Sequence, residues 1–336
     1  MSRLVATAKL LRGGGVPWLR AARDGLAAVR LAVAAAGSST GVLECLRDGP
    51  VGTASVRAQL GLDDGGLLEP WLRVLQAHGL VRASDAGWSL SRRGRRLLDD
   101  EVLRAAYEGF AGFHTGLYRE LPRQLRGGTP RRDVAEQGET IAQLTRAMEP
   151  VLHEALVAAV REVRPARVLD VGCGAGQNLA AMLAAAPVAE GTGIEVDDAV
   201  ADLAERLLAR RGLTGRARVL RGDVAALAAG DRAGGPYDLA LLANVVYYLP
   251  LAERVPLFRA VAGLLSEGGA LLVTTTAATS DPFSRHFDLL LRAQGRGMEL
   301  PEVEPLRQQL ADAGLRPAPA RRLAPGQPLV AVAARR

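Results

Sequence analysis

The chain has 336 residues, of which 49% are hydrophobic and 23% are charged, an ordinary composition for a soluble globular protein with room for two domains. Its two cysteines, Cys45 and Cys173, exclude a disulfide framework, and their spacing does not suit a metal site. No apolar run is long enough to cross a bilayer or to act as a signal peptide, so we expect a cytoplasmic protein without a membrane partner.

The formal net charge of +6 leaves a nucleic-acid partner open, because basic proteins bind phosphate backbones. The arginines are spread along the chain, with small clusters at residues 92–96 and 206–218. Such small clusters are typical of solvated helix ends and turns. Nucleic acid is therefore the less favoured partner.

The first hundred residues predict an arm and then a small domain. Residues 1–20 are amphipathic but interrupted by three glycines and Pro17, so we expect a loose arm. Residues 21–100 predict a mostly helical, winged-helix-like domain. Its successive elements are a helix over 54–60, a break at Gly61, a second helix over 67–78 that Asp63 and Asp64 can cap, and a hairpin formed by 80–82 and 88–90.

A winged helix can read DNA or form a dimer interface, and the second helix helps to distinguish these roles. A recognition helix normally offers several polar and basic side chains to base edges. Residues 66–77 offer mainly Glu69, Arg73 and Gln76 among apolar residues. Such a helix buries its surface, which favours dimerisation.

Residues 101–160 predict a helical bridge with a polar break near 127–132. The aromatic and imidazole side chains of Tyr107, His114 and Tyr118 can line a flat, apolar substrate. Phe110 and Phe113 lie among them, and the alternative is that the whole group packs between helices at a spacing of three to four residues.

Beyond Pro165, short apolar runs alternate with helical stretches, which predicts a parallel α/β sheet. The runs are apolar throughout, as expected for strands covered by helices on both faces. We expect strands over 168–171, 191–196, 218–220, 237–243 and 270–275, and a terminal antiparallel pair over 316–323 and 328–333. The catalytic domain would then span residues 161–336.

The first of these strands leads into a glycine-rich loop and a helix. Asp170 ends the apolar run, and Gly172, Gly174 and Gly176 follow at alternate positions. Glycines in such a loop let the backbone turn tightly and let a ligand approach closely. Dinucleotide-binding proteins use a related loop, but there the third glycine normally comes one residue later.

Acidic or amide side chains follow the next three strands. Glu195 ends the second strand, Asp223 follows the third and Asn244 follows the fourth. Ligands of open parallel sheets lie beyond the carboxyl ends of the strands, where a carboxylate in the position of Glu195 can accept both ribose hydroxyls. Asp223 is placed to accept from an adenine amino group. The alternative is that Glu195 and Asp223 are ordinary cap and turn residues.

These motifs, in this order, make residues 150–336 resemble the class I methyltransferase family. The resemblance implies a Rossmann-like, seven-stranded sheet with a C-terminal antiparallel pair, and S-adenosylmethionine as the cofactor. The implied cofactor-binding residues are Asp170, Gly172 and Gly174 along the methionine part, Glu195 on the ribose, Val196 and Val224 around the adenine, Asp223 on its amino group and Asn244 on the methyl-bearing side.

The front half resembles the small-molecule O-methyltransferases of secondary metabolism. In that family a winged-helix domain forms the dimer interface and a helical bridge closes over the substrate, and residues 52–98 and 137–150 are similar in style. The resemblance implies a homodimer that methylates a small, natural-product-like acceptor at O, N or C. An RNA or DNA methyltransferase and a non-methylating S-adenosylmethionine-binding protein are the alternatives.

One departure concerns the catalytic base. The O-methyltransferase family carries a histidine shortly after the fourth strand, where this chain has Tyr247. Because a free tyrosine titrates near pH 10, Tyr247 suits the role of orienting the acceptor better than that of removing its proton. His286, in a segment that often lines the substrate pocket of the family together with Phe283, is the second catalytic candidate. No constellation of residues suggests a metal.

Overall fold

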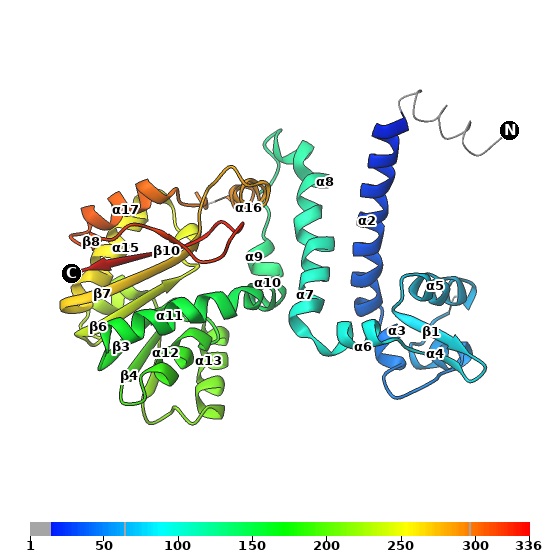
Figure 1. Ribbon diagram of the computed structural model, residues 1–336, viewed down its shortest axis with the longest axis horizontal. Coiled ribbons are helices and arrows are strands. Elements are labelled where there is room, and N and C mark those ends of the chain that lie inside the picture. The colour runs from blue at the N-terminus through cyan, green and yellow to red at the C-terminus, as the bar shows by residue number, and fades with distance from the viewer. Residues whose placement is uncertain (1–14, 64, 296) are drawn as a thin grey trace. The chain divides into compact units, whose positions relative to one another are not determined.

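The computed structural model describes residues 15–336 except 64 and 296 (Figure 1). It forms two compact units: the chain up to Gly128 with Arg132–Ala147, and Thr129–Arg131 with Met148–Arg336. The finer division into four segments stays a prediction. Most of the predicted arm, together with Asp64 as a helix cap, lies outside the described residues.

The first unit is mainly helical. Its helices are α2 (Gly15–Ser39), α3 (Val42–Cys45), α4 (Thr53–Gln59), α5 (Gly65–Ala77), α6 (Arg92–Asp99), α7 (Glu101–Gly109), α8 (Thr115–Gln124), α9 (Asp133–Glu136) and α10 (Gly138–Thr145). The prediction of an arm is wrong for residues 15–20, which begin α2. Pro17 lies in the first turn of that helix, where backbone N–H groups have no partner within the helix. Proline lacks an N–H, so it costs no hydrogen bond at this position.

The predicted order of helix, turn, helix and hairpin is present. Strands β1 (Val81–Ser84) and β2 (Gly87–Leu90) form the hairpin, and Val51 bridges Trp88 at its edge. The indole of Trp88 donates to the Thr53 hydroxyl at 3.1 Å, and that hydroxyl donates to Glu69 at 2.8 Å. The Arg73 guanidinium lies 4.9 Å from the centre of the Trp88 ring. Two of the polar side chains of α5 are therefore engaged inside the unit.

Between α7 and α8 the helix widens into a π-helical turn, η1 (Phe110–His114), that the sequence did not predict. Such turns are rare and are often found at functional sites. The imidazole of His114 is buried and stacks on Phe110, with ring centres 4.5 Å apart. The extra backbone residue in this turn thus brings the predicted substrate-lining histidine between aromatic neighbours.

The second unit begins with α11 (Glu149–Val163) after a short 3₁₀ turn, η2 (Arg146–Met148), and contains the predicted α/β sheet. Its strands are β3 (Arg167–Val171), β4 (Glu190–Glu195), β5 (Ala217–Arg221), β6 (Tyr237–Ala243), β7 (Leu265–Thr276), β8 (Arg316–Pro317), β9 (Arg321–Arg322) and β10 (Leu329–Arg335). They lie in the order β5-β4-β3-β6-β7-β10-β8, with β9 also paired to β10. Strands β3 to β7 are parallel, and β10 runs antiparallel to β7.

Helices cover both faces of this sheet (Figure 1). One face packs on α11, α12 (Gln177–Ala185) and α13 (Asp198–Arg210), and the other on α14 (Val224–Ala229), α15 (Leu251–Leu264) and α17 (Val303–Asp312). In β6, Leu239 and Leu241 enter one core while Ala240 and Leu242 enter the other. This alternation explains why the strands read as apolar throughout.

The predicted strand over 316–323 is wrong as a single element. The structure has two two-residue strands there, β8 and β9, which pair with opposite ends of β10. Pro317 ends β8 and Pro319 lies between the two strands, and proline cannot donate a ladder hydrogen bond. The sheet therefore has the predicted seven-strand path plus a short eighth strand beside β10.

Candidate cofactor and acceptor site

The glycine loop between β3 and α12 has an unusual backbone. Gly172, Gly174 and Gly176 all have positive φ angles, of 68°, 53° and 82°. A Cβ on Gly172 would lie 2.7 Å from a methyl carbon of Val245, whereas a Cβ on Gly174 would meet nothing within 4 Å. Gly172 is therefore required by packing, and Gly174 faces open space into which a ligand can approach.

Glu195 holds this loop from the end of β4. Its carboxylate accepts from the backbone N–H groups of Gly174 at 2.9 Å, Val196 at 2.9 Å and Asp197 at 3.2 Å. Its side chain is largely buried. A carboxylate fixed at the strand end in this way has oxygen lone pairs to spare and can accept from further donors.

Asp170 lies beneath the loop and is fully buried. Neither of its carboxylate oxygens makes a hydrogen bond of normal geometry with the described residues. Burial raises the pKa of this carboxyl to about 7, with the charge of Glu195 adding to the effect and the backbone N–H of Leu179 opposing it. An unpaired buried carboxyl is costly and is expected where a ligand supplies the partner.

These features fit S-adenosylmethionine. The loop has open space beside Gly174, Asp170 lacks a partner, and Glu195 stands at the neighbouring strand end. A ligand with a cationic methionine part and a ribose would engage both carboxylates. The residues present therefore suit the cofactor that the sequence predicted.

The three predicted adenine-binding residues differ in their surroundings. Asp223 caps α14, with one carboxylate oxygen accepting from the N–H groups of Ala225 and Ala226 at 2.9 and 3.0 Å. Val196 is 71% exposed, but Val224 is only 3% exposed and packs in the core. Capping a helix is thus the ordinary role that the sequence left open for Asp223. The second carboxylate oxygen of Asp223 accepts no cap hydrogen bond among the described residues. The adenine contacts of all three stay predictions.

Asn244 follows β6 in a left-handed conformation, with φ of 58°. Its N–H donates to the Thr274 carbonyl at 2.8 Å, which holds the residue at the edge of the sheet. A left-handed non-glycine residue costs free energy and often marks a functional position. This agrees with a ligand-lining role without testing it.

Tyr247 lies in an aromatic cluster just beyond Asn244, in the 3₁₀ turn η3 (Val246–Tyr248). Its ring meets that of Tyr248 edge-on at 4.6 Å and that of Phe287 at 5.4 Å. Burial raises the pKa of the Tyr247 hydroxyl well above its usual value, and its hydrogen bond to Tyr248 adds to this. Tyr247 is therefore a neutral hydrogen-bonding group rather than a base.

Helix α16 (Pro282–Arg292) brings the other predicted residues of this unit to the same cluster. Phe283 stacks on Phe287 with centres 6.1 Å apart, and its centre is 6.2 Å from that of His286. Burial lowers the pKa of His286, which keeps the imidazole neutral near pH 7. The sequence analysis missed Phe287, although its spacing of four residues from Phe283 places both on one helix face.

The remaining predicted substrate-lining residues belong to the first unit. Tyr107 lies in α7, where its hydroxyl accepts from Arg93 at 3.4 Å. His114 is buried in η1, and Tyr118 lies half exposed on α8. Their role toward an acceptor stays a prediction.

Arg254, in α15, is a site residue that the sequence analysis missed. It is 1% exposed, and its guanidinium donates to the carbonyls of Leu249 at 3.2 Å and Glu299 at 2.7 Å. The N–H of Glu299 in turn donates to the Tyr247 carbonyl at 3.2 Å. Arg254 thus ties the segment after Tyr247 to the loop that follows α16.

Replacing Arg254 by methionine is expected to destabilise this loop. Two partly buried carbonyls would lose charged donors, which costs about 3 kcal/mol. Chemical denaturation of the Arg254→Met variant measures this, with Arg259→Met as the matched control because Arg259 lies on the same helix with a single bond to the Asp312 carbonyl. Equal losses in both variants would contradict the positioning role of Arg254.

None of the helices in the described part of the chain combines the length and apolar character needed to cross a membrane. Within residues 15–336, leaving aside 64 and 296, no three His, Cys, Asp or Glu side chains are grouped as metal ligands would be.

Comparison with known proteins agrees with this geometry. Residues 168–269 match the family described as "Methyltransferase domain". The chain is similar to O-demethylpuromycin-O-methyltransferase of Streptomyces alboniger, with 27% identity over 287 residues that cover 78% of this chain and 74% of that protein. It is also 32% identical over 110 residues to the polyketide synthase ThaQ of Burkholderia thailandensis, which covers 33% of this chain and 5% of that much longer protein.

Solved structures share the fold over nearly the whole length. Mitomycin 7-O-methyltransferase MmcR superposes with a TM-score of 0.74 at 24% identity, covering 98% of this chain and 99% of that one. The dimethyltransferase RosA of Streptomyces davawensis, named for N,N-8-amino-8-demethyl-D-riboflavin, gives 0.74 at 22% identity, covering 94% and 98%. With its glycine loop, its carboxylates and these likenesses, the chain carries an S-adenosylmethionine-dependent methyltransferase domain, and it shares the fold of these solved methyltransferases.

Proposed function

We propose that this enzyme methylates a small, natural-product-like acceptor with an aromatic or similarly flat body. The observation that carries the proposal is the aromatic cluster of Tyr247, Tyr248, Phe283 and Phe287, which begins three residues after Asn244. Flat rings stack favourably on such side chains. The similar proteins are named for puromycin, mitomycin and riboflavin derivatives, which supports this class of acceptor.

The cofactor supplies an electrophilic methyl group, and the chain supplies binding and orientation. Asp170 and Glu195 would hold the methionine part and the ribose, and the open face of Gly174 would let the cofactor lie against the loop. Transfer between bound partners needs chiefly alignment of the acceptor atom with the methyl group, and positioning alone can supply a large share of the rate.

Tyr247 and His286 have different parts in this proposal. The neutral hydroxyl of Tyr247 orients the acceptor, because its raised pKa makes it a weak base. The imidazole of His286, held neutral by its partial burial, takes a proton from an acceptor hydroxyl. An amine or carbon nucleophile would depend on His286 less, which leaves O, N and C acceptors open.

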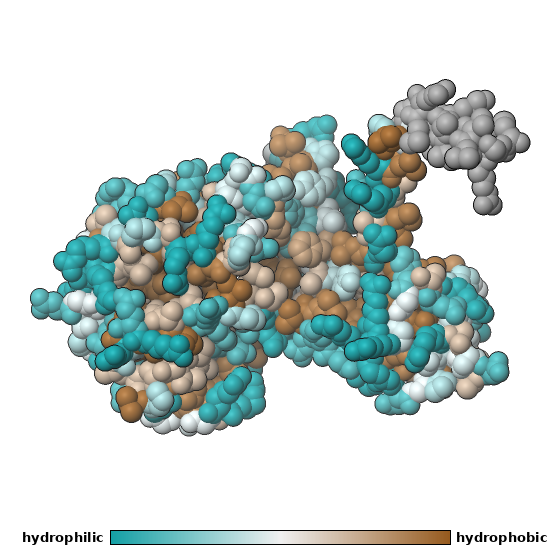
Figure 2. Space-filling view, in the orientation of Figure 1, coloured by the Kyte–Doolittle hydropathy of each residue, from teal (hydrophilic) through white to brown (hydrophobic). Residues whose placement is uncertain are grey.

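We further propose that the first unit pairs with a second copy of the chain. Helix α2 carries apolar side chains along its exposed length, visible as hydrophobic colour on that helix in Figure 2. They are Val16, Trp18, Leu19, Leu26 and Val29. Exposed apolar stretches of this kind mark protein interfaces. Sedimentation of the wild type against a Trp18→Glu, Leu26→Glu double variant distinguishes a dimer from a monomer.

A label-transfer assay tests the proposed function. Purified enzyme, methyl-labelled S-adenosylmethionine and an extract of an actinomycete-like host are incubated and separated into small-molecule, protein and nucleic-acid fractions. Label in the small-molecule fraction supports the proposal and gives a mass to identify. Label in nucleic acid alone would replace it by an RNA or DNA methyltransferase. A protein that binds cofactor but labels nothing would contradict methylation of any acceptor in the extract.

The Tyr247→Phe variant is expected to turn over about tenfold more slowly while binding the cofactor as the wild type does. The hydroxyl removed is worth about one hydrogen bond to the acceptor, and the ring and its packing remain. Single-turnover rates and equilibrium dialysis of labelled cofactor measure the two quantities. Tyr237→Phe, which removes a hydroxyl at the opposite end of β6, is the matched control. Equal rates in wild type and Tyr247→Phe would remove Tyr247 from the mechanism.

A further inference from the structure

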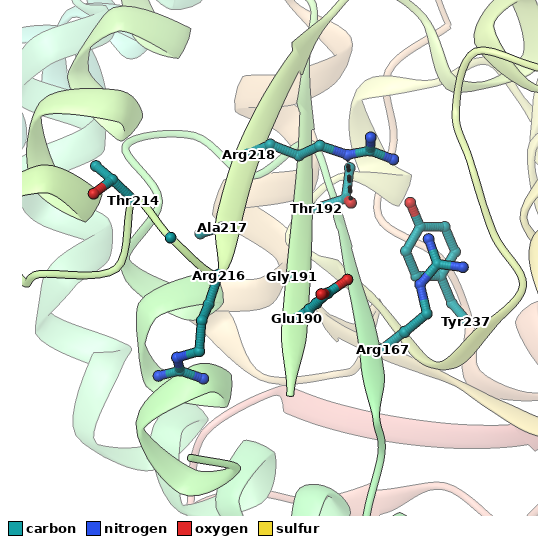
Figure 3. Close-up of a pocket in the computed structure, with 10 residues that line it drawn as sticks. Arg167, Glu190, Gly191, Thr192, Thr214, Arg216, Ala217, Arg218 and Tyr237 are labelled. Carbon is teal, nitrogen blue, oxygen red and sulfur yellow. Dashed lines mark hydrogen bonds between the residues drawn. The ribbon is translucent and has the colours of Figure 1, made fainter. Parts of the chain in front are cut away.

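The amino ends of the parallel strands form a second pocket on the edge of the sheet opposite the glycine loop. It has a volume of about 270 Å³ and lies where β3, β4, β5 and β6 begin (Figure 3). Arg167, Arg216 and Arg218 line it, against the single carboxylate of Glu190. The pocket therefore has a net positive charge, and it is separate from the cofactor edge.

Two of the arginines converge on one point. A Cβ placed on Gly234 would lie 2.5 Å from Nη2 of Arg218 and 3.7 Å from Nη2 of Arg167, so both guanidinium groups approach the same small space beside that glycine. Within the described chain, no carboxylate lies within 4 Å of either group. Two like charges brought together without a counter-ion repel each other, and an anion between them would offset this.

Both guanidinium groups are held in place before any ligand arrives. Arg167 lies 5.0 Å from the centre of the Tyr237 ring, and its Nη1 donates to the carbonyls of Gly235 and Pro236. Arg218 donates through Nε to the Thr192 hydroxyl at 3.2 Å. These contacts leave Nε and Nη2 of Arg167 and both terminal nitrogens of Arg218 as donors. Preorganised donors lose little entropy on binding.

The third arginine has a different role. Figure 3 shows Arg216 directed away from the other two. Its guanidinium donates to the carbonyls of Ala186 and Ala189, just past the end of α12, at 3.3 and 2.8 Å, and also to that of Leu183 in the last turn of this helix. Arg216 therefore contributes charge to the pocket while its donors are engaged.

We propose that this pocket binds a compact phosphate-bearing ligand between Arg167 and Arg218. Guanidinium groups bind phosphate oxygens in pairs, and two of them suit a phosphomonoester or a diphosphate. The small volume favours a compact anion, since pockets for drug-sized ligands are typically about 300–1,000 Å³. A nucleic-acid backbone would instead need an extended row of basic side chains.

Inorganic pyrophosphate is the probe, titrated into the full chain by calorimetry at fixed ionic strength. The wild type is expected to bind it at one saturable site. Arg218→Gln should weaken that affinity at least tenfold, because it removes the guanidinium without touching the core. Arg206→Gln is the matched control, since Arg206 is an exposed arginine of α13 outside the pocket. This variant should bind pyrophosphate as tightly as the wild type does.

Each alternative outcome has a clear meaning. Absence of saturable binding in the wild type, or equal affinity in the wild type and Arg218→Gln, would overturn the proposal. Salt-sensitive binding of RNA without binding of pyrophosphate would also overturn it in favour of a macromolecular ligand. Labelled S-adenosylmethionine is measured in parallel and should bind all three proteins equally, so that failure of the anion site is distinguishable from failure of the cofactor site.

Discussion

The Glu195→Ala variant is expected to lose at least a hundredfold in affinity for S-adenosylmethionine. Glu195 is held at the end of β4 by N–H groups of Gly174, Val196 and Asp197, and we propose that its carboxylate also accepts the ribose hydroxyls. Hydrogen bonds to a charged group contribute about 1.5–3 kcal/mol each, so losing two of them exceeds the roughly 2.7 kcal/mol that a hundredfold change represents. Equilibrium dialysis of labelled cofactor measures the effect.

Two controls separate binding from folding. Glu190→Ala changes the exposed glutamate at the opposite end of the same strand and should leave cofactor affinity unchanged. Glu195→Gln keeps an oxygen acceptor for the loop but loses the charge, so an intermediate affinity with a wild-type circular dichroism spectrum is expected. If Glu195→Ala binds the cofactor as tightly as the wild type, the ribose assignment is wrong.

The sequence was informative wherever burial dictates a local pattern. Strand β6 occupies the predicted 237–243 because both of its faces are buried and residues 239–243 are all apolar. Strand β7 begins at Leu265, five residues before the predicted start. Gly268 and Gly269 lie in the added segment, and glycine is unfavourable in strands, but pairing of Leu265 with Tyr237 extends the strand through them. Tertiary pairing has overridden local propensity.

The cofactor edge was predictable because its residues follow strands directly, and the carboxyl ends of parallel strands meet at one edge. Arg254 was not predictable, since its burial depends on carbonyls at 249 and 299 that are distant in sequence from each other. The convergence of Arg167 and Arg218 also depends on the sheet, which brings together strand starts some fifty residues apart. Their positions in the sequence looked like ordinary strand ends.

The pH dependence of the second unit is expected to arise largely from Asp170. Its pKa is about 7 in the folded chain, whereas an unfolded aspartate titrates near 4. Between these values the folded chain binds more protons than the unfolded chain, so the free energy of unfolding falls as pH rises from about 4 to 7 and levels off above that range. The full effect is on the order of 4 kcal/mol.

The isosteric Asp170→Asn variant should lose this dependence and exceed the wild type in stability at pH 8. Hydrogen exchange of the peptide that covers β3 is the suitable measurement, because it reports the second unit alone. A wild type whose exchange protection is the same at pH 5 and pH 8, after correction for the intrinsic exchange rate, would show that Asp170 is not a buried titrating group.

Cofactor binding should have the opposite pH dependence from stability. The methionine part of S-adenosylmethionine carries a sulfonium and an ammonium, and an ionised Asp170 attracts them while a protonated one does not. Affinity of the wild type is therefore expected to rise by up to about tenfold per pH unit below pH 7 and to level off above it. Asp170→Asn should bind weakly at every pH. Ionised Asp170 lowers the stability of the free protein yet favours the cofactor, so cofactor binding would offset the cost of burying this charge. A pH-independent affinity in the wild type would instead show that Asp170 does not contact the cofactor.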